Sequence, residues 1–151
     1  MDIAFRFSGN KEDAYEVRRR VFVDEQGFVE EFDAIDEDPR MIHLTLYLDG
    51  KLAGCARLFP SDIEPKIDAE QGLWVLGRFA IFPEYRKYGL GTKLLRASEE
   101  EAIRHGAACA VLHAQCRVTP FYEKSGYVAF GPIEFEEHVE HQWMKKDLTR
   151  A

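Results

Sequence analysis

Residues 73–95 read LWVLGRFAIFPEYRKYGLGTKLL, and the change of pattern within this stretch decides the fold. Residues 73–82 are almost continuously apolar, as expected of a strand that is covered on both faces. Pro83 ends this strand, because proline has no N–H group to donate to a sheet. Residues 89–105 then repeat apolar side chains at helical spacing and stop before Gly106, the usual kind of residue after a helix. A buried strand therefore leads through a glycine-containing turn into a helix.

The turn before this helix combines two glycines with two cations, Arg86 and Lys87. The first amide N–H groups of a helix lack partners within the helix and carry partial positive charge. Gly89 and Gly91 would let a ligand come close to that backbone. The pattern is typical of a phosphate-binding site, although a tight turn with solvated cations would produce the same sequence.

Composition and charge limit the class of protein. The 151 residues are 46% hydrophobic and 31% charged, which is typical of a globular chain, so we expect one domain over residues 1–151. A net charge of −7 disfavours binding to nucleic acid through bulk electrostatics. No apolar run approaches the roughly 20 residues that cross a bilayer, and the first residues do not resemble a signal peptide. Cys55, Cys109 and Cys116 have no metal-type spacing, so we expect no metal site and a cytoplasmic protein with reduced thiols.

The rest of the chain alternates short strands with helices. Residues 13–26 repeat apolar side chains at helical spacing. The dipeptide Asp49-Gly50 between two apolar segments predicts an antiparallel hairpin. The remaining expected elements are strands at 3–7, 43–49, 51–59, 108–114, 127–130 and 142–147, a short helix at 119–125, and polar connections at 27–41 and 61–72. This order predicts a mixed α/β sandwich, and the antiparallel hairpin excludes a doubly wound parallel sheet.

Two segments of the chain resemble motifs of the GNAT N-acetyltransferase superfamily. Residues 77–91, GRFAIFPEYRKYGLG, resemble its acyl-CoA motif, an apolar strand followed by (Arg/Gln)-x-x-Gly-x-(Gly/Ala) and a helix. The three defined positions of that motif hold Arg86, Gly89 and Gly91. Residues 119–127, TPFYEKSGY, resemble the superfamily's Phe-Tyr-x-x-x-Gly-(Phe/Tyr) segment. The resemblance implies an α/β fold in which a mixed, largely antiparallel twisted sheet has splayed parallel central strands and flanking helices.

A third segment narrows the resemblance to one branch. Residues 17–27, VRRRVFVDEQG, are similar to the N-terminal helix of the ElaA/YjcF-like acetyltransferases. Residues 138–144, HVEHQWM, keep the histidine and methionine of that branch's C-terminal signature, whereas its glycine and proline are replaced. Further positions that match the branch are Asp33, Asp36, His43, Arg57 and the dipeptide Ala114-Gln115. The candidate substrate-binding residues that follow from this resemblance are Gln26, Asp33, Asp36 and His43.

The resemblance implies that acetyl-CoA is the co-substrate and that it binds where the central strands splay apart. Its pyrophosphate would meet the amide N–H groups of residues 87–92, with added charge from Arg86. Its pantetheine arm would lie along residues 79–81 like an added strand, and an N–H near Phe79 or Ile81 would polarise the thioester carbonyl. The expected cofactor-binding residues are Phe79, Ala80, Ile81, Arg86, Lys87, Tyr88, Gly89, Leu90, Gly91, Thr92 and Phe121.

Transfer of an acyl group to an amine needs both an acid and a base. Tyr122 matches the superfamily's tyrosine acid, and a phenol with a pKa of about 10 can protonate a thiolate with a pKa of about 8.5 at little cost. For the base we select Glu25, at the end of the first helix, and His141, near the last strand. The alternatives that stay open are His43, Asp33, Asp36 and a water molecule. Cys116 as a covalent nucleophile is disfavoured, because no histidine is adjacent to it in sequence.

The sequence therefore predicts an acetyl-CoA-dependent N-acetyltransferase that acts on a primary amine of a small molecule or peptide. Acidic residues within 24–38 and 134–140 would attract a cationic amine if they frame the acceptor site, although they would equally form a solvated surface. The alternative function is a module on the same fold that binds acyl-CoA or a protein without turnover. Exposed strand edges and Trp143 permit a homodimer.

Overall fold

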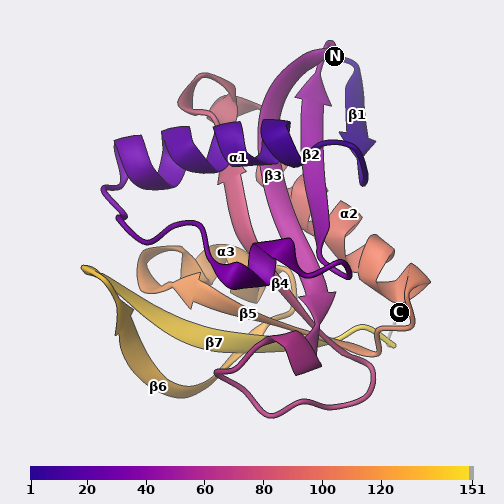
Figure 1. The fold of residues 1–151 in the computed structure, drawn as a ribbon, viewed down its shortest axis with the longest axis vertical. Coiled ribbons are helices and arrows are strands. Elements are labelled where there is room, and N and C mark those ends of the chain that lie inside the picture. The colour runs from indigo at the N-terminus through magenta and orange to yellow at the C-terminus, as the bar shows by residue number, and fades with distance from the viewer. Residues whose placement is uncertain (150–151) are drawn as a thin grey trace.

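A seven-stranded sheet runs through the centre of the computed structural model, which describes residues 1–149 (Figure 1). The strands are β1 (Ile3–Arg6), β2 (Ile42–Leu48), β3 (Lys51–Pro60), β4 (Leu73–Ile81), β5 (Cys109–Gln115), β6 (Val128–Glu136) and β7 (Val139–Asp147). Their spatial order is β1-β2-β3-β4-β5-β7-β6, and among the described residues only the central pair β4–β5 is parallel. The mixed, largely antiparallel sheet that the resemblance implies is confirmed.

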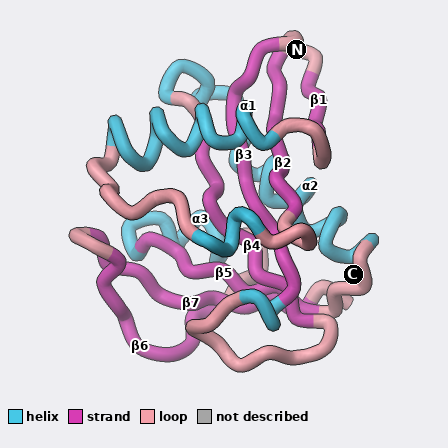
Figure 2. Tube along the Cα trace, viewed as in Figure 1, coloured by secondary structure: helices cyan, strands magenta, loops and turns pink. Residues whose placement is uncertain are grey.

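Helices cover both faces of the sheet (Figure 2). The first helix, α1 (Lys11–Arg18), continues into a π-helical turn (Arg19–Glu25) and lies on one face. The second and third, α2 (Leu90–Arg104) and α3 (Thr119–Lys124), pack into the core of the other face. Short 3-10 turns occur at Ala34–Glu37, Ser61–Ile63, Pro83–Tyr88 and Cys116–Val118.

The two faces of the sheet have separate apolar cores. On the α1 face, Val17 and Phe22 share a cluster with Ala80 of β4. On the α2 face, Leu94 shares a cluster with Leu76 of β4. Both faces of β4 are therefore covered, which explains why its sequence is almost continuously apolar.

The parallel strands β4 and β5 pair only at their beginnings. Leu73–Val75 is in register with Cys109–Val111, and no further pairing joins the two strands within residues 1–149. Because β4 continues to Ile81 and β5 continues to Gln115, the strands separate over their C-terminal halves. Separated strands leave backbone donors and acceptors on their facing edges, which makes this opening a place for a ligand.

The hairpin between β2 and β3 has the predicted turn. Asp49 and Gly50 have φ angles of 50° and 79°. A two-residue turn of type I′ requires positive φ at both positions, which is why an Asp-Gly pair suits it. This part of the sequence analysis is confirmed.

The first helix differs from its prediction over residues 13–26. The α-helix ends at Arg18, and in the π-helical turn that follows, the amide of Gln26 donates to the carbonyl of Val21 at 3.1 Å. A π turn inserts an extra residue into the helical register. With this extra residue, the side chain of Arg18 contacts buried carboxylates and the side chain of Val21 packs toward the sheet. Helical spacing alone does not predict this arrangement.

The last two strands are longer than predicted, because β6 runs to Glu136 and β7 begins at Val139. The acidic residues that the sequence places before the last strand form part of this hairpin instead. Donors from distant segments bind the carboxylates of these residues. Lys66 donates to Glu136 at 3.0 Å, and the amide of Val29 donates to Glu137 at 2.8 Å. Tertiary contacts therefore accompany strands in a segment to which the sequence assigned no element.

Candidate functional site

Two cavities lie in the opening between β4 and β5. The larger, which we term the outer groove, has a volume of about 550 Å³, and the smaller, the inner pocket, has a volume of about 140 Å³. The residues that line both are Gln26, Phe79, Arg117, Val118 and Tyr122. The two cavities therefore form one site with a common boundary.

The structure brings most of the sequence-predicted residues to this site. Of the expected cofactor-binding residues, all except Lys87 and Tyr88 line the outer groove. Glu25 also lines the outer groove, Gln26 and Tyr122 lie at the boundary, and His141 lines the inner pocket.

The edge of β4 that faces the opening carries backbone groups without a partner strand. The amide of Phe82 donates to the carbonyl of Ala53 in β3 at 2.8 Å. Because these groups alternate in direction along a regular strand, the amide of Ile81 points away from β3 and toward the opening. No strand pairs with this edge in the described chain. The edge can therefore pair with an extended ligand.

A β-bulge in β4 lies beside this edge. The register of β4 against β3 shifts at Arg78 and Phe79, and Arg78 has a φ angle of 53°, in the left-handed region. A bulge bends its strand and re-aims a side chain. The ring of Phe79 faces that of Tyr122 from the other wall, with 6.1 Å between their centroids.

The N-terminus of α2 borders the outer groove. Gly89 precedes the helix with a φ angle of 67°, and a Cβ atom at this position would meet no atom within 4 Å. Among residues 1–149, no group outside the helix accepts a hydrogen bond from the amides of Gly89, Leu90 or Gly91. Open space in front of free helical amides is the arrangement that binds phosphate.

Arg86 and Glu25 form an ion pair on the wall of the outer groove. Both terminal nitrogens of Arg86 donate to the Glu25 carboxylate at 2.7 Å, and Arg86 Nε donates to the carbonyl of Ile81 at 2.9 Å. The hydrogen bond from Arg86 lowers the pKa of Glu25. Glu25 is therefore ionised at neutral pH and holds the cation that the sequence analysis assigned to a pyrophosphate. The assignment of Glu25 as a base stays a prediction.

Tyr122 lies at the boundary of the two cavities. Its side chain is buried, and this burial raises the pKa of its phenol. The hydroxyl has no hydrogen-bond partner among the described residues. Tyr122 is therefore protonated at neutral pH, as a proton donor has to be.

Polar side chains from several elements surround the inner pocket. Gln115 Nε2 donates to Gln26 Oε1 at 2.8 Å, which joins the end of β5 to the end of the first helix. Arg117 lies at the boundary with the outer groove and donates to Gln115 Oε1 at 3.0 Å. His141 is buried on β7. The residues of this pocket that sequence reasoning missed as site residues include Phe28, Glu31, Arg78, His113, Gln115 and Arg117.

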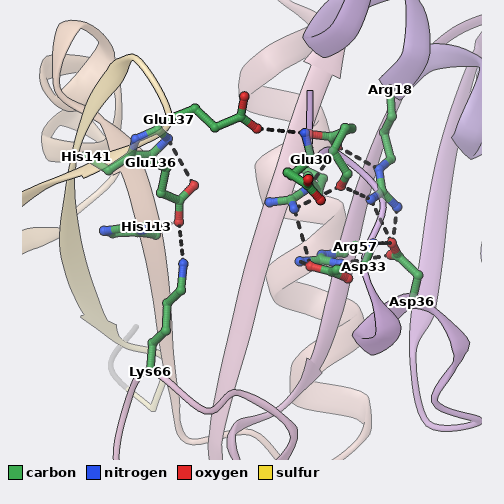
Figure 3. Close-up of polar contacts among 12 residues, drawn as sticks. Arg18, Glu30, Asp33, Asp36, Arg57, Lys66, His113, Glu136, Glu137 and His141 are labelled. Atoms are coloured by element: carbon green, nitrogen blue, oxygen red, sulfur yellow. Dashed lines mark hydrogen bonds and ion pairs between the residues drawn. The ribbon is translucent and has the colours of Figure 1, made fainter. Parts of the chain in front are cut away.

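Asp33 and Asp36 are placed in a buried ion network rather than in either cavity (Figure 3). Arg18 donates to Asp36 at 2.7 and 2.9 Å, and Arg57 donates to Asp36 at 2.8 Å and to Asp33 at 3.0 Å. Burial alone would raise the pKa of Asp36, but the hydrogen bonds from Arg18 hold it well below its usual value. Both carboxylates are bound to arginines and line neither cavity, and their assignment to the substrate stays a prediction.

His43 also lies away from both cavities. It is buried on β2 and lines a separate surface hollow next to Asn10 and Lys11. Burial lowers the pKa of its imidazole, and neither ring nitrogen has a hydrogen-bond partner among the described residues. Its ring packs edge-on against Tyr15, with 5.6 Å between the centroids. The assignment of His43 to the substrate also stays a prediction.

The acidic segments do not form an open negative surface around the site. The ion pairs that involve them include Glu25–Arg86, Glu31–Arg18, Asp33–Arg57, Asp36–Arg18, Glu37–Lys11, Asp38–Arg40 and Glu136–Lys66. Cations of the protein itself therefore match much of the negative charge of these segments.

The splayed parallel strands, the free β4 edge and the open start of α2 together define an acyltransferase-type site. Residues 11–127 match the family described as the acetyltransferase (GNAT) family, and the chain belongs to that family. The uncharacterized N-acetyltransferase YjcF of Bacillus subtilis is 32% identical to it over 138 residues, which cover 89% of this chain and 91% of YjcF.

Solved structures share the fold. An acyl-CoA N-acyltransferase from Pseudomonas aeruginosa superposes with a TM-score of 0.80 at 24% identity, covering 96% of this chain and 98% of that one. ElaA of Escherichia coli superposes with a TM-score of 0.80 at 20% identity, covering 97% of this chain and 99% of that one. The resemblance to the ElaA/YjcF-like acetyltransferases is confirmed, and family membership supports acyl transfer as the class of reaction. Within residues 1–149, no helix is long and apolar enough to cross a membrane.

Proposed function

We propose that this protein transfers an acetyl group from acetyl-CoA to a primary amine. The observation that carries the proposal is the outer groove, where the free β4 edge, the open N-terminus of α2 and Tyr122 line one cavity. Coenzyme A carries a group that matches each of these features: amides in its pantetheine arm, a diphosphate and a terminal sulfur. The relatives and the structural neighbours support the same assignment.

Backbone groups of the outer groove would bind two parts of coenzyme A, its diphosphate and its pantetheine arm. The amides of Gly89, Leu90 and Gly91 would bind the diphosphate, each charge-assisted bond contributing about 1.5–3 kcal/mol. The β4 edge at Phe79 and Ile81 would pair with the pantetheine arm. For this pairing to include the carbonyl of Ile81, Arg86 has to leave it, which frees the guanidinium to approach the diphosphate.

The same edge would stabilise the developing negative charge of the reaction. The amide of Ile81 faces the opening, and this amide or the neighbouring amide of Phe79 would donate to the thioester oxygen as it becomes an oxyanion. One such donor typically lowers the barrier by roughly 3–4 kcal/mol.

The chemistry forms one bond and breaks one. The amine nitrogen attacks the thioester carbonyl carbon, a C–N bond forms, and the C–S bond breaks. The amine would give up a proton to His141, which lines the inner pocket, and Tyr122 would donate a proton to the departing thiolate. The products are an N-acetylated amine and free coenzyme A.

The size of the inner pocket favours a short acyl group. Its 140 Å³ has to hold both the acyl group and the reacting end of the amine. The aromatic rings of Phe28, Phe79 and Tyr122 and the side chain of Leu112 bound this space. We therefore assign acetyl rather than a longer chain.

The free cysteines bear on the compartment in which the protein works. Cys55, Cys109 and Cys116 are free thiols, which is in keeping with a cytoplasmic protein. The homodimer stays a prediction, and so does the identity of the amine.

Thiol release tests the proposal. Purified protein is mixed with acetyl-CoA and a panel of primary amines, and free coenzyme A thiol is measured against time. Tyr122→Phe should lower kcat by about 100-fold with coenzyme A binding unchanged, because it removes the acid alone. Tyr85→Phe, which loses a hydroxyl outside both cavities, is the matched control and should keep full activity. Coenzyme A binding with no thiol release for any amine would instead favour the non-catalytic module.

A further inference from the structure

A carboxylate on β6 lies between two histidines beside the inner pocket (Figure 3). Glu136 Oε1 is 2.7 Å from His113 Nδ1, and Glu136 Oε2 is 3.6 Å from His141 Nε2. Lys66 Nζ donates to Glu136 Oε1 at 3.0 Å from the loop before β4. The three residues come from adjacent strands, β5, β7 and β6, and both histidines line the pocket.

The hydrogen-bond partners of His113 and His141 determine which ring nitrogen of each imidazole carries a hydrogen. The carbonyl of Val139 can only accept, and it lies 3.0 Å from His141 Nδ1, so Nδ1 carries the hydrogen. In the neutral ring, Nε2 of His141 is then the basic nitrogen. Burial alone would raise the pKa of Glu136, but hydrogen bonds from His113 and Lys66 hold it well below its usual value. Glu136 is therefore ionised, and His113 Nδ1 donates to it.

Other charged groups act less directly on this cluster. The titratable groups that face the two rings are Glu134 and Glu136 of β6, Arg78 of β4, Lys66, and each ring's own histidine partner. Burial lowers the pKa of His141, so it is neutral and basic at neutral pH. Within the described residues, Glu136 is the carboxylate closest to His141 Nε2, since Glu134 faces His113 at 3.6 Å.

We propose that His113, Glu136 and His141 form one proton-accepting unit for the acceptor amine, which extends the function proposed above. His141 Nε2 takes the proton that the amine nitrogen loses when it bonds to the acyl carbon. Glu136 is a positioning residue that offsets the positive charge of the new imidazolium, and His113 fixes the orientation of Glu136 by its hydrogen bond. The proton passes to water when the product leaves, which restores neutral His141.

The unit complements Tyr122. Tyr122 and His141 line the same pocket of 140 Å³, so the proton donor for sulfur and the proton acceptor for nitrogen share one small volume. Neither Glu136 nor His113 is adjacent in sequence to Tyr122, and only the pairing of β7 with β5 and β6 brings them together.

NMR titration of the imidazoles in the full chain tests the unit without any acceptor. Glu136→Gln should lower the pKa of His141 by about one unit, because the neighbouring negative charge is lost. Lys66→Met should raise it, because a cation that offsets Glu136 is lost. Glu134→Gln removes a carboxylate of the same strand that faces His113 instead, and as the matched control it should move His141 much less. An equal His141 pKa in the wild type and Glu136→Gln overturns the unit.

Thiol release with acetyl-CoA and the amine panel then separates this inference from the proposed function. The acid limb of kcat/KM should follow the NMR values, moving to lower pH in Glu136→Gln and to higher pH in Lys66→Met. The plateau of Glu136→Gln should fall by about tenfold, because the imidazolium loses its counter-charge. Thiol release whose acid limb ignores both variants overturns His141 as the base but leaves acyl transfer in place. A wild type that releases no thiol with any amine overturns the proposed function itself, and with it the catalytic role of the unit.

Discussion

The outer groove and the inner pocket meet at Tyr122, yet they are built in different ways. Half of the residues that line the outer groove come from one contiguous stretch, residues 79–92, which contains the free β4 edge and the open start of α2. The inner pocket is formed by side chains from the first helix, the loop after it, β4, β5 and β7. A site made of backbone depends on glycines and on strand pairing, whereas a site made of side chains depends on how distant charges are matched.

The ion pairs next to the inner pocket are formed by buried side chains. Arg18 is 1% exposed and binds Glu31 at 3.0 Å and Asp36 at 2.7 Å. Arg78, which lines the pocket, contacts Glu31 at 2.8 Å. Among the described residues, the ion pair on the wall of the outer groove is Arg86–Glu25, whose side chains are 42% and 37% exposed. The two regions should therefore respond very differently to the loss of one charge.

Arg18→Met should have the largest effect. It leaves Glu31 and Asp36 buried without one of their cations, and breaking a buried pair in this way costs about 3–5 kcal/mol of the free energy of unfolding. Urea unfolding at pH 7 measures this loss. The pKa of Asp36 is lowered in the fold, so the stability it contributes is present above its unfolded pKa of about 3.9 and is lost as the pH falls toward the folded value. The difference between variant and wild type should shrink below about pH 4.

Arg19→Met is the control for this variant. Arg19 is the next residue, is 53% exposed at its side chain and pairs only with Glu16 in the described chain. Its loss should change stability by less than about 1 kcal/mol. Equal stabilities of the two variants would show that the buried network does not hold the inner pocket in place.

Gly89→Asp should have the next largest effect, and it acts on the outer groove alone. A carboxylate at the start of α2 would repel a diphosphate, so we expect affinity for coenzyme A to fall by at least about 100-fold. Calorimetric titration with coenzyme A measures this change. Gly89→Asn is the control, because asparagine and aspartate tolerate positive φ similarly and differ here in charge. If both variants bind coenzyme A equally well, the diphosphate does not lie at this helix.

The same contrast explains what the sequence could predict. The strand, Pro83, the paired glycines and the helix of residues 73–105 lie next to one another in the chain, so local pattern was enough to predict both the elements and the free amides. The Asp49-Gly50 hairpin is predictable for the same reason. Family resemblance added the splayed geometry of β4 and β5, which no local pattern contains.

Most contacts of the inner pocket could not be predicted from the sequence, because they join residues that are far apart in the chain. Glu136 is 23 residues from His113, and its segment lies between the two predicted strands at 127–130 and 142–147. Asp36 was assigned to the substrate because it matched a branch pattern, yet Arg18 and Arg57 bind it in the core. A matched motif position shows that a residue is needed, and only its partners show whether it is needed for chemistry or for packing.

Glu25→Gln should have the smallest effect of these variants, and it should strengthen rather than weaken the binding of coenzyme A. Glu25 holds Arg86 against the carbonyl of Ile81, so its neutral form should release the guanidinium and remove a negative charge from the groove. We expect the dissociation constant for coenzyme A to fall two- to fivefold at neutral pH, and less at high salt because the pair is partly exposed. Since Arg86 lowers the pKa of Glu25, this difference should persist down to about pH 4. A kcat that falls by 100-fold or more would identify Glu25, rather than the histidine unit of the inner pocket, as the base.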